Sequence, residues 1–205
     1  MKLAALLVWC ACAFGADAAR LSFTKTFVGS APPFFAIVVA PDGKATYNES
    51  TDPDNAEAIQ LETRVVTEMF ALADKLEHFK NPLESGLKVA NMGMKVLRWE
   101  ENGQGTESKF NYTSSEDAKL LSDWFERIAE SERQLLELKR ATKHDRLGVD
   151  AAIVGIQTSW NNRRLVGTPQ FLPVLDEVAG NEVYIHMARE RAAQIADAIR
   201  ARDSK

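Results

Sequence analysis

The apolar residues of this chain change their spacing near residue 113, and this change restricts the fold more than any other feature. Up to about Tyr112, apolar and polar residues mostly alternate, which is typical of strands with one buried face. From Ser115 onward, apolar residues recur at every third or fourth position, which is typical of amphipathic helices. The sequence therefore predicts an α+β fold in which a sheet precedes a group of helices.

The N-terminal half is expected to form an antiparallel or mixed sheet of about five strands. Lys25 lies on the apolar side of the first strand, so we expect that strand at an edge, where an inward charge discourages further pairing. The run 34–40 does not alternate, which predicts a central strand covered on both faces. A turn is expected at 41–44 and a polar loop at 50–55. The strands are expected at 21–27, 34–40, 45–48, 95–99 and 108–112.

The helices are expected to cover the sheet and then to pack on one another. An apolar stripe at 63–77 predicts a helix on one face of the sheet. Serine and acidic residues at 113–117 predict the start of a second helix, which continues to about Lys143. At ~1.5 Å per residue this helix is on the order of 40 Å long, so its second half is expected to pack on later helices. Those are expected at 149–163, 169–179 and 182–202.

Residues 1–18 have the layout of a secretory signal peptide: Lys2, an apolar run at 3–15, and small residues up to Ala18, where cleavage is expected. The apolar run is shorter than the roughly 20 residues of a membrane-spanning helix. Both cysteines, Cys10 and Cys12, lie in this segment, and the residues before them are a poor match to a lipid-attachment site. We therefore expect a secreted or periplasmic protein whose mature chain has no thiol.

The mature chain is expected to divide into a sheet-plus-helix domain at 19–114 and a helical region at 115–205 that shares the long helix. The formal net charge is −4 and no basic patch with interleaved aromatic residues is present, so nucleic acid is not an expected partner. No apolar stretch after the signal peptide approaches spanning length, so no stable membrane span is expected. No catalytic or cofactor-binding motif occurs, and we expect no cofactor.

The candidate site residues are three histidines that each lie near a carboxylate in the sequence. Glu182, His186 and Glu190 are spaced to share one helix face and to offer three ligands to a divalent cation. However, they would span roughly 12 Å along a straight helix, so a solvated acidic face is the favoured interpretation. His78 follows Asp74 by one turn, and His144 precedes Asp145.

Other charged groups have simpler interpretations. The acidic run 52–57 lacks the glycine and the final glutamate of a calcium-binding loop, so a flexible acidic loop is favoured over a metal site. On the long helix, Asp123 with Arg127 and Glu130 with Arg133 are spaced for ordinary surface ion pairs.

The segment 83–95 mixes small, polar and apolar residues and has two methionines beside a glycine. Such a segment suits either a packed connection or an adaptable binding loop, and packing is the favoured interpretation. With HFxxPLESGLKVANMGMK at 78–95 and KFNY at 109–112, the chain resembles a group of uncharacterised exported bacterial proteins, chiefly acidobacterial. The resemblance extends over residues 21–201 and implies no activity and no catalytic residue.

Two functional hypotheses follow. The first is a non-enzymatic envelope protein that binds or scaffolds a partner, most simply another envelope protein, through an exposed apolar patch. The second is an envelope hydrolase that uses dispersed carboxylates and one histidine, which requires a pocket where titratable groups converge. A histidine in a cleft with a second carboxylate would favour the enzyme, and three separate, exposed histidines would favour the binding protein.

Overall fold

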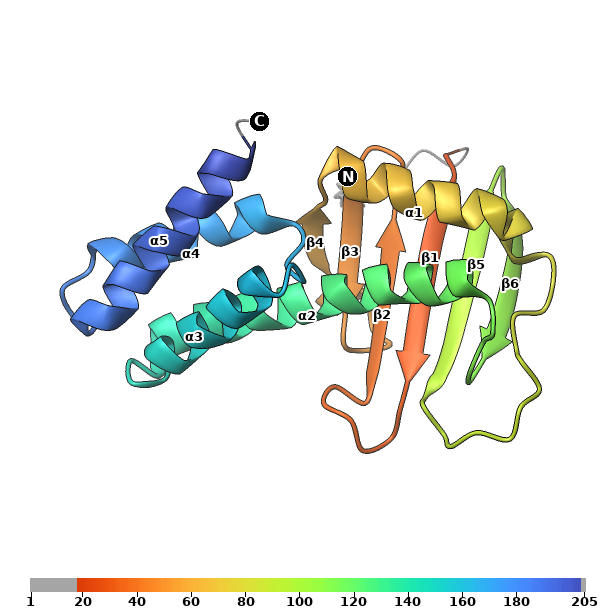
Figure 1. Ribbon diagram of the computed structural model, residues 1–205, viewed down its shortest axis with the longest axis horizontal. Coiled ribbons are helices and arrows are strands. Elements are labelled where there is room, and N and C mark those ends of the chain that lie inside the picture. Colours follow the sequence, from red (N-terminus) through yellow and green to blue (C-terminus); the bar gives the residue numbers. More distant parts are fainter. Residues whose placement is uncertain (1–17, 204–205) are drawn as a thin grey trace, which may run out of the picture.

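The structure is a computed structural model that describes residues 18–203 (Figure 1). Almost all of the predicted signal peptide, including Cys10 and Cys12, lies outside the described residues. The described chain forms an antiparallel sheet with helices on one face, followed by further helices beside the sheet. The predicted α+β class, with a helical C-terminal part, is confirmed.

The sheet has six strands rather than about five, and every neighbouring pair is antiparallel. The strand order is β4-β3-β2-β1-β5-β6. The additional strand is β4, which has a single inward apolar residue, Ile59, and so leaves almost no alternation in the sequence. The strands are β1 (Arg20–Thr26), β2 (Phe34–Val39), β3 (Lys44–Asn48), β4 (Glu57–Gln60), β5 (Met94–Glu101) and β6 (Gln104–Phe110).

Two strand predictions are wrong. Strand β1 lies between β2 and β5, not at an edge, and the inward Lys25 is tolerated there because Glu126 pairs with it at 2.8 Å. Strand β2 is central, as expected, but only one of its faces is covered. Phe35, Ile37 and Val39 are buried, whereas the alternate residues are partly exposed on the helix-free face.

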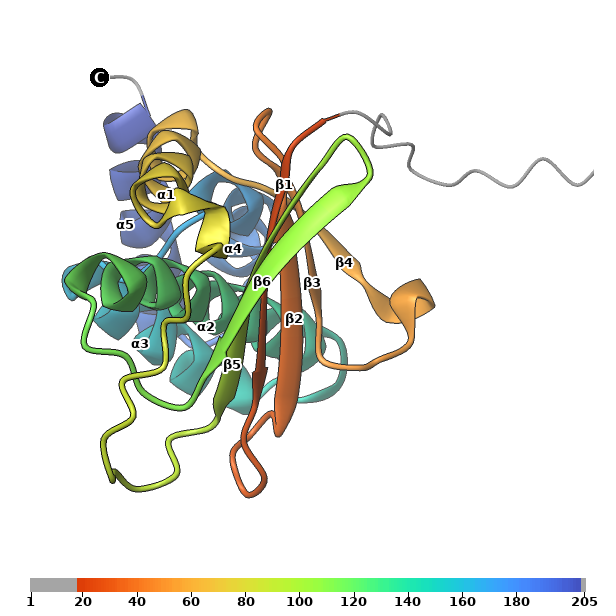
Figure 2. The ribbon, with the colours of Figure 1, turned by 90° about the vertical axis from the view of Figure 1, so that its right-hand side faces the viewer.

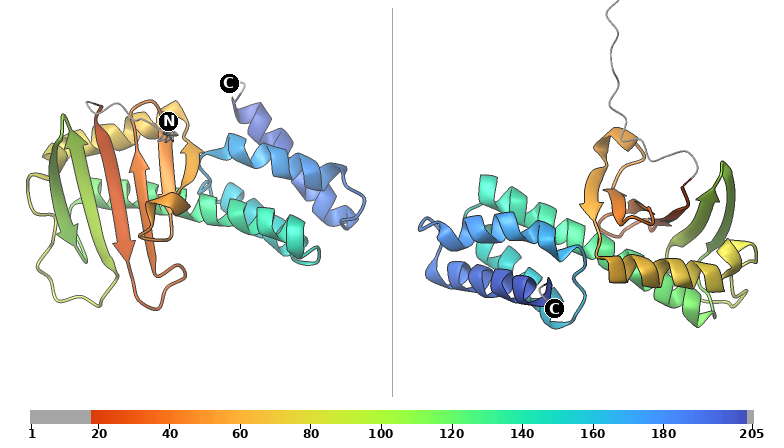
Figure 3. Two further views of the ribbon diagram at one scale, coloured as in Figure 1. Left: turned by 180° about the vertical axis from the view of Figure 1, so that it is seen from behind. Right: turned by 90° about the horizontal axis from the view of Figure 1, so that it is seen from above.

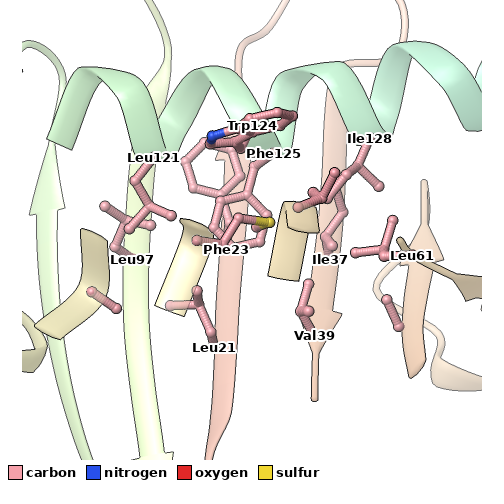
Figure 4. Close-up of a cluster of buried hydrophobic side chains, with 14 of the residues drawn as sticks. Leu21, Phe23, Ile37, Val39, Leu61, Leu97, Leu121, Trp124, Phe125 and Ile128 are labelled. Atoms are coloured by element: carbon pink, nitrogen blue, oxygen red, sulfur yellow. The ribbon is translucent and has the colours of Figure 1, made fainter. Parts of the chain in front are cut away.

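Helices α1 (Thr63–Lys75) and α2 (Glu116–His144) cover the same face of the sheet (Figure 2). Helix α2 begins as predicted, with the Ser115 hydroxyl accepting a hydrogen bond from the Ala118 N–H. Phe23 of β1 stacks on Phe125 of α2 with ring centroids 4.9 Å apart, and Ile37 lies beneath Ile128 (Figure 4). Burial of each such side chain contributes about 1.5–3 kcal/mol, so this seam holds α2 on the sheet.

Helix α2 continues past the β4 edge and supports the rest of the molecule (Figures 1 and 3). Its Leu121 and Ile128 belong to the core of the sheet, and its Leu135 and Leu138 belong to a second core. The other elements of that second core are α3 (Gly148–Asn161), the turn at Thr168–Phe171, α4 (Leu172–Gly180) and α5 (His186–Asp203). The last helix was expected from residue 182, but it begins at His186, because residues 181–184 form a turn closed by the Tyr184 N–H and the Asn181 carbonyl.

Glu62, just before α1, ties the sheet to the second core. Its carboxylate accepts hydrogen bonds from the backbone N–H groups of Gly167 and Thr168 at 2.8 and 3.1 Å. Arg202 of α5 forms an ion pair with the same carboxylate at 3.1 Å. One carboxylate therefore connects three distant segments, which fixes the helical part against the sheet.

Candidate functional site

An irregular segment of the chain, residues 81–93, connects α1 to β5 and is held against β6 by hydrogen bonds. The Asn111 side chain accepts from the Met92 N–H at 2.7 Å and donates to the Ala90 carbonyl at 3.0 Å. The Glu84 carboxylate accepts from the Asn111 N–H at 2.6 Å, and this hydrogen bond lowers the pKa of Glu84. Loops of this length without secondary structure are uncommon and are usually functional or linkers.

Leu83 packs against the core of the sheet, but the apolar side chains from Leu87 to Met94 are exposed, which corrects the packing interpretation for that part of the segment. Leu87 is 60% exposed and Met92 is 49% exposed. The loop between β1 and β2 lies beside it at the same end of the sheet (Figure 1), and a Cβ on Gly93 would be 2.9 Å from the Phe27 Cβ. At the tip of that neighbouring loop, Val28 is 87% exposed. We call the resulting surface the apolar loop end; it consists of Val28, Leu87, Val89, Met92 and Met94.

A second group of exposed apolar residues lies at the opposite end of the molecule, where the helices of the second core turn. Leu147 is in the connection between α2 and α3, and Val183, Ile185 and Met187 are at the start of α5. Tyr184 in the same turn is buried, and its hydroxyl donates to the Thr142 carbonyl at 3.4 Å. This group surrounds a short turn, 181–184, which is also held by hydrogen bonds but is much shorter than the loop 81–93.

His78 lies in a strained turn after α1. Glu77, His78 and Phe79 have φ of 51°, 53° and 62°, a left-handed conformation that costs non-glycine residues roughly 1–2 kcal/mol each. The turn buries Phe79 in the core and stacks the His78 ring on Trp99, with centroids 4.0 Å apart. The ring Nε2 is 2.7 Å from a carboxylate oxygen of Asp74, which confirms that these two neighbours meet in space. The side chain of His78 is 31% exposed.

The candidate metal ligands are not arranged as the helix spacing suggested. Glu182 precedes α5 and so does not share its face with His186 and Glu190. The His186 side chain is 86% exposed, and its Nε2 is 4.0 Å from the Glu190 carboxylate. Within residues 18–203, no cluster of three or more histidine, cysteine or acidic residues could hold a metal ion. In the acidic run 52–57, the Asp52 carboxylate accepts from the Asp54 N–H and caps a short turn.

Two cavities lie between the sheet and α2, and Tyr47 of β3 lines both. The larger has a volume of about 230 Å³ and lies between the β1–β2 loop and α2; we call it the α2 cleft. The smaller, of about 210 Å³, lies beside the loop that follows β3. The Tyr47 hydroxyl donates to Glu49 at 2.6 Å, and burial raises the pKa of this tyrosine, so it stays protonated. Neither of these cavities is lined by a histidine.

The charged groups of the α2 cleft are mostly paired with one another. Lys25 pairs with Glu126, and Arg164 pairs with Glu130 at 2.6 Å and with Asp123 at 3.2 Å. The predicted pair of Asp123 with Arg127 is present at 2.7 Å, but Glu130 does not pair with Arg133 because Arg164 occupies its carboxylate. Arg164 follows α3 and reaches Glu130 only through the tertiary fold, so no spacing in the sequence signals this contact.

Arg133 is the residue of the α2 cleft that has no carboxylate partner in the part of the chain that the structure describes. It lies on α2 and is exposed, and its Nη1 donates to the Ala31 carbonyl of the β1–β2 loop at 2.7 Å. It forms no ion pair with any residue between 18 and 203. Among the described residues, Arg133 is therefore the cation of the larger cleft that has no ion pair of its own.

The sequence allowed an adaptable binding loop at 83–95 as the less favoured interpretation, but it gave no indication of the α2 cleft. None of the helices that the structure describes is both long and apolar enough to cross a lipid bilayer. No protein-family model and no curated protein matches this chain.

Proposed function

We propose that this protein is a non-enzymatic exported binding protein that docks an envelope protein on the apolar loop end. The observation that carries the proposal is the display of exposed apolar side chains on a loop held in place by its own hydrogen bonds. Exposed apolar groups cost free energy in water, and contiguous patches of them mark interaction sites. Because the loop is ordered before binding, less conformational entropy is lost when a partner binds.

The histidines give no support to the hydrolase alternative. His144 and His186 are exposed and distant from the two cavities, and His78 stacks on Trp99 with one neighbouring carboxylate, Asp74. The carboxylates of the α2 cleft are already engaged by Lys25 and Arg164. A general acid or base needs a free group within reach of a bound substrate, and the carboxylates that line the α2 cleft are already paired.

Photo-crosslinking in the producing bacterium tests the docking surface. With p-benzoylphenylalanine in place of Leu87 or Met92, we expect one crosslinked product that contains an envelope protein. Leu147 is the matched control, because it is an apolar residue 89% exposed at the other end of the molecule. The proposal would be contradicted if the probe at 87 and at 92 gave no crosslinked product, or if the probe at 147 gave the same product. A product of twice the chain mass would replace the envelope partner by a second copy of this chain.

Export is tested separately from docking. We expect the native protein in the periplasm or the medium, with an intact mass that corresponds to a chain beginning at Ala19. A cytoplasmic protein that retains Met1 would contradict this part of the proposal and leave the crosslinking result unaffected.

A further inference from the structure

The structure also contains a cleft that suits a small ligand. It shares the β1–β2 loop with the apolar loop end but is lined by different residues. The α2 cleft is bounded on one side by the β1–β2 loop and on the other by α2. Its volume of about 230 Å³ is below the roughly 300–1,000 Å³ of sites that hold drug-sized ligands. A ligand of the size of a single substituted ring is therefore the largest that the cleft would enclose.

The walls of the cleft provide one apolar side and one charged side. Phe27, Pro32 and Phe35 contribute apolar groups from the β1–β2 loop and β2. Lys25 and Arg164 are each neutralised by carboxylates, as described above, and thus contribute no net charge. Arg133 supplies the remaining positive charge, and its hydrogen bond to the Ala31 carbonyl holds the guanidinium at the cleft.

We infer that the α2 cleft binds a small organic carboxylate with a compact apolar group, and that Arg133 pairs with the carboxylate. A guanidinium matches a carboxylate geometrically, because two parallel N–H groups can donate to its two oxygens. The apolar group of the ligand packs on the wall formed by Phe27, Pro32 and Phe35. The carboxylate neutralises the one cation of the cleft that has no acidic partner within the described chain.

The test uses benzoate and phenylacetate as probes and the full mature protein. Isothermal titration calorimetry gives the affinity, and amide chemical shifts give the location. We expect binding of the acids, with shifts confined to residues 27–35 and 126–133, and at least ~10-fold weaker binding of benzamide, which has the same ring without the charge.

Two variants on the same helix separate the role of Arg133 from a general effect of positive charge. Arg133→Gln is expected to weaken benzoate binding at least ~10-fold, in line with the loss of a charge-assisted hydrogen bond. Arg140→Gln is the matched control, because Arg140 is also exposed on α2 but does not line the cleft. This variant should bind benzoate with the same affinity as the unmodified protein.

Several results would overturn the inference. These are equal affinity for benzamide and benzoate, an unchanged affinity in Arg133→Gln, or an equal loss in Arg140→Gln. Shifts that map away from the cleft, or no binding of either acid, would also overturn it. The shift mapping uses the unmodified protein, so it decides the question even if a variant folds poorly.

Discussion

The carboxyl group of Glu132 should make the stability of this protein depend strongly on pH. Glu132 lies on α2 at the junction of the two cores and is only 3% exposed. Its carboxyl accepts a hydrogen bond from the Gln170 side chain, and Lys139 provides a weaker favourable charge. Burial outweighs both and raises the pKa of Glu132 from 4.5 to about 7.

The size and sign of the effect follow from that shift. The folded protein binds this proton more tightly than the unfolded chain, so unfolding releases a proton between about pH 4.5 and 7. The stability linked to this proton is therefore fully present below about pH 4.5 and is lost as the pH rises to 7. At 1.36 kcal/mol per pKa unit, the loss is about 3 kcal/mol above pH 7.

The substitution Glu132→Gln should remove this dependence. The glutamine amide oxygen can still accept from Gln170, but it has no charge to bury. We expect the variant and the unmodified protein to have the same free energy of unfolding at pH 4.5, and the variant to be more stable by about 3 kcal/mol at pH 8. The measurement is urea unfolding followed by circular dichroism. Glu137→Gln, an exposed position on the same helix, should give no such pH-dependent difference. If the free energies of unfolding of Glu132→Gln and the unmodified protein differ by the same amount from pH 4.5 to 8, the reasoning is refuted.

Three further substitutions test the core, the joint and the loop. Phe125→Ala removes a fully buried ring, and we expect the free energy of unfolding in urea to fall by about 3–5 kcal/mol. A fall of less than about 1 kcal/mol would contradict the packing of α2 on the sheet. Glu62→Ala leaves the backbone N–H groups of residues 167 and 168 without their acceptor, and should lower the free energy of unfolding by about 2–4 kcal/mol in the same assay. The control Glu68→Ala, on the exposed face of α1, should leave the free energy of unfolding almost unchanged. Asn111→Ala removes the two side-chain hydrogen bonds that hold the loop, so limited proteolysis should cut residues 86–93 faster while the global stability stays unchanged. Equal cleavage rates in the variant and the unmodified protein would show that other contacts hold the loop.

The candidate surfaces differ in how far they could be predicted from the sequence. The loop 81–93 was recognisable, because a mixture of small, polar and methionine residues without any period indicates a connection outside regular structure. Whether its apolar residues were buried was not recognisable. That depends on Asn111, which lies about twenty residues further along the chain and holds the backbone so that the side chains face outward.

The α2 cleft had no signal in the sequence. Arg133 was expected to pair with Glu130, one turn away on the same helix. In the fold, Arg164 arrives from the end of α3 and takes that carboxylate, which leaves Arg133 without an acidic partner. A charge becomes unbalanced here only because a segment distant in sequence competes for its neighbour.

Local patterns were sufficient to place nearly every strand and helix of this protein and to predict the α+β class. The period of the apolar residues is set by the backbone geometry of each element, and that geometry needs no knowledge of the rest of the chain. Strand order, the tolerance of Lys25 in a central strand and the partners of Glu130 were decided only in three dimensions. These features depend on contacts between residues far apart in sequence, which leave no periodic trace in either partner.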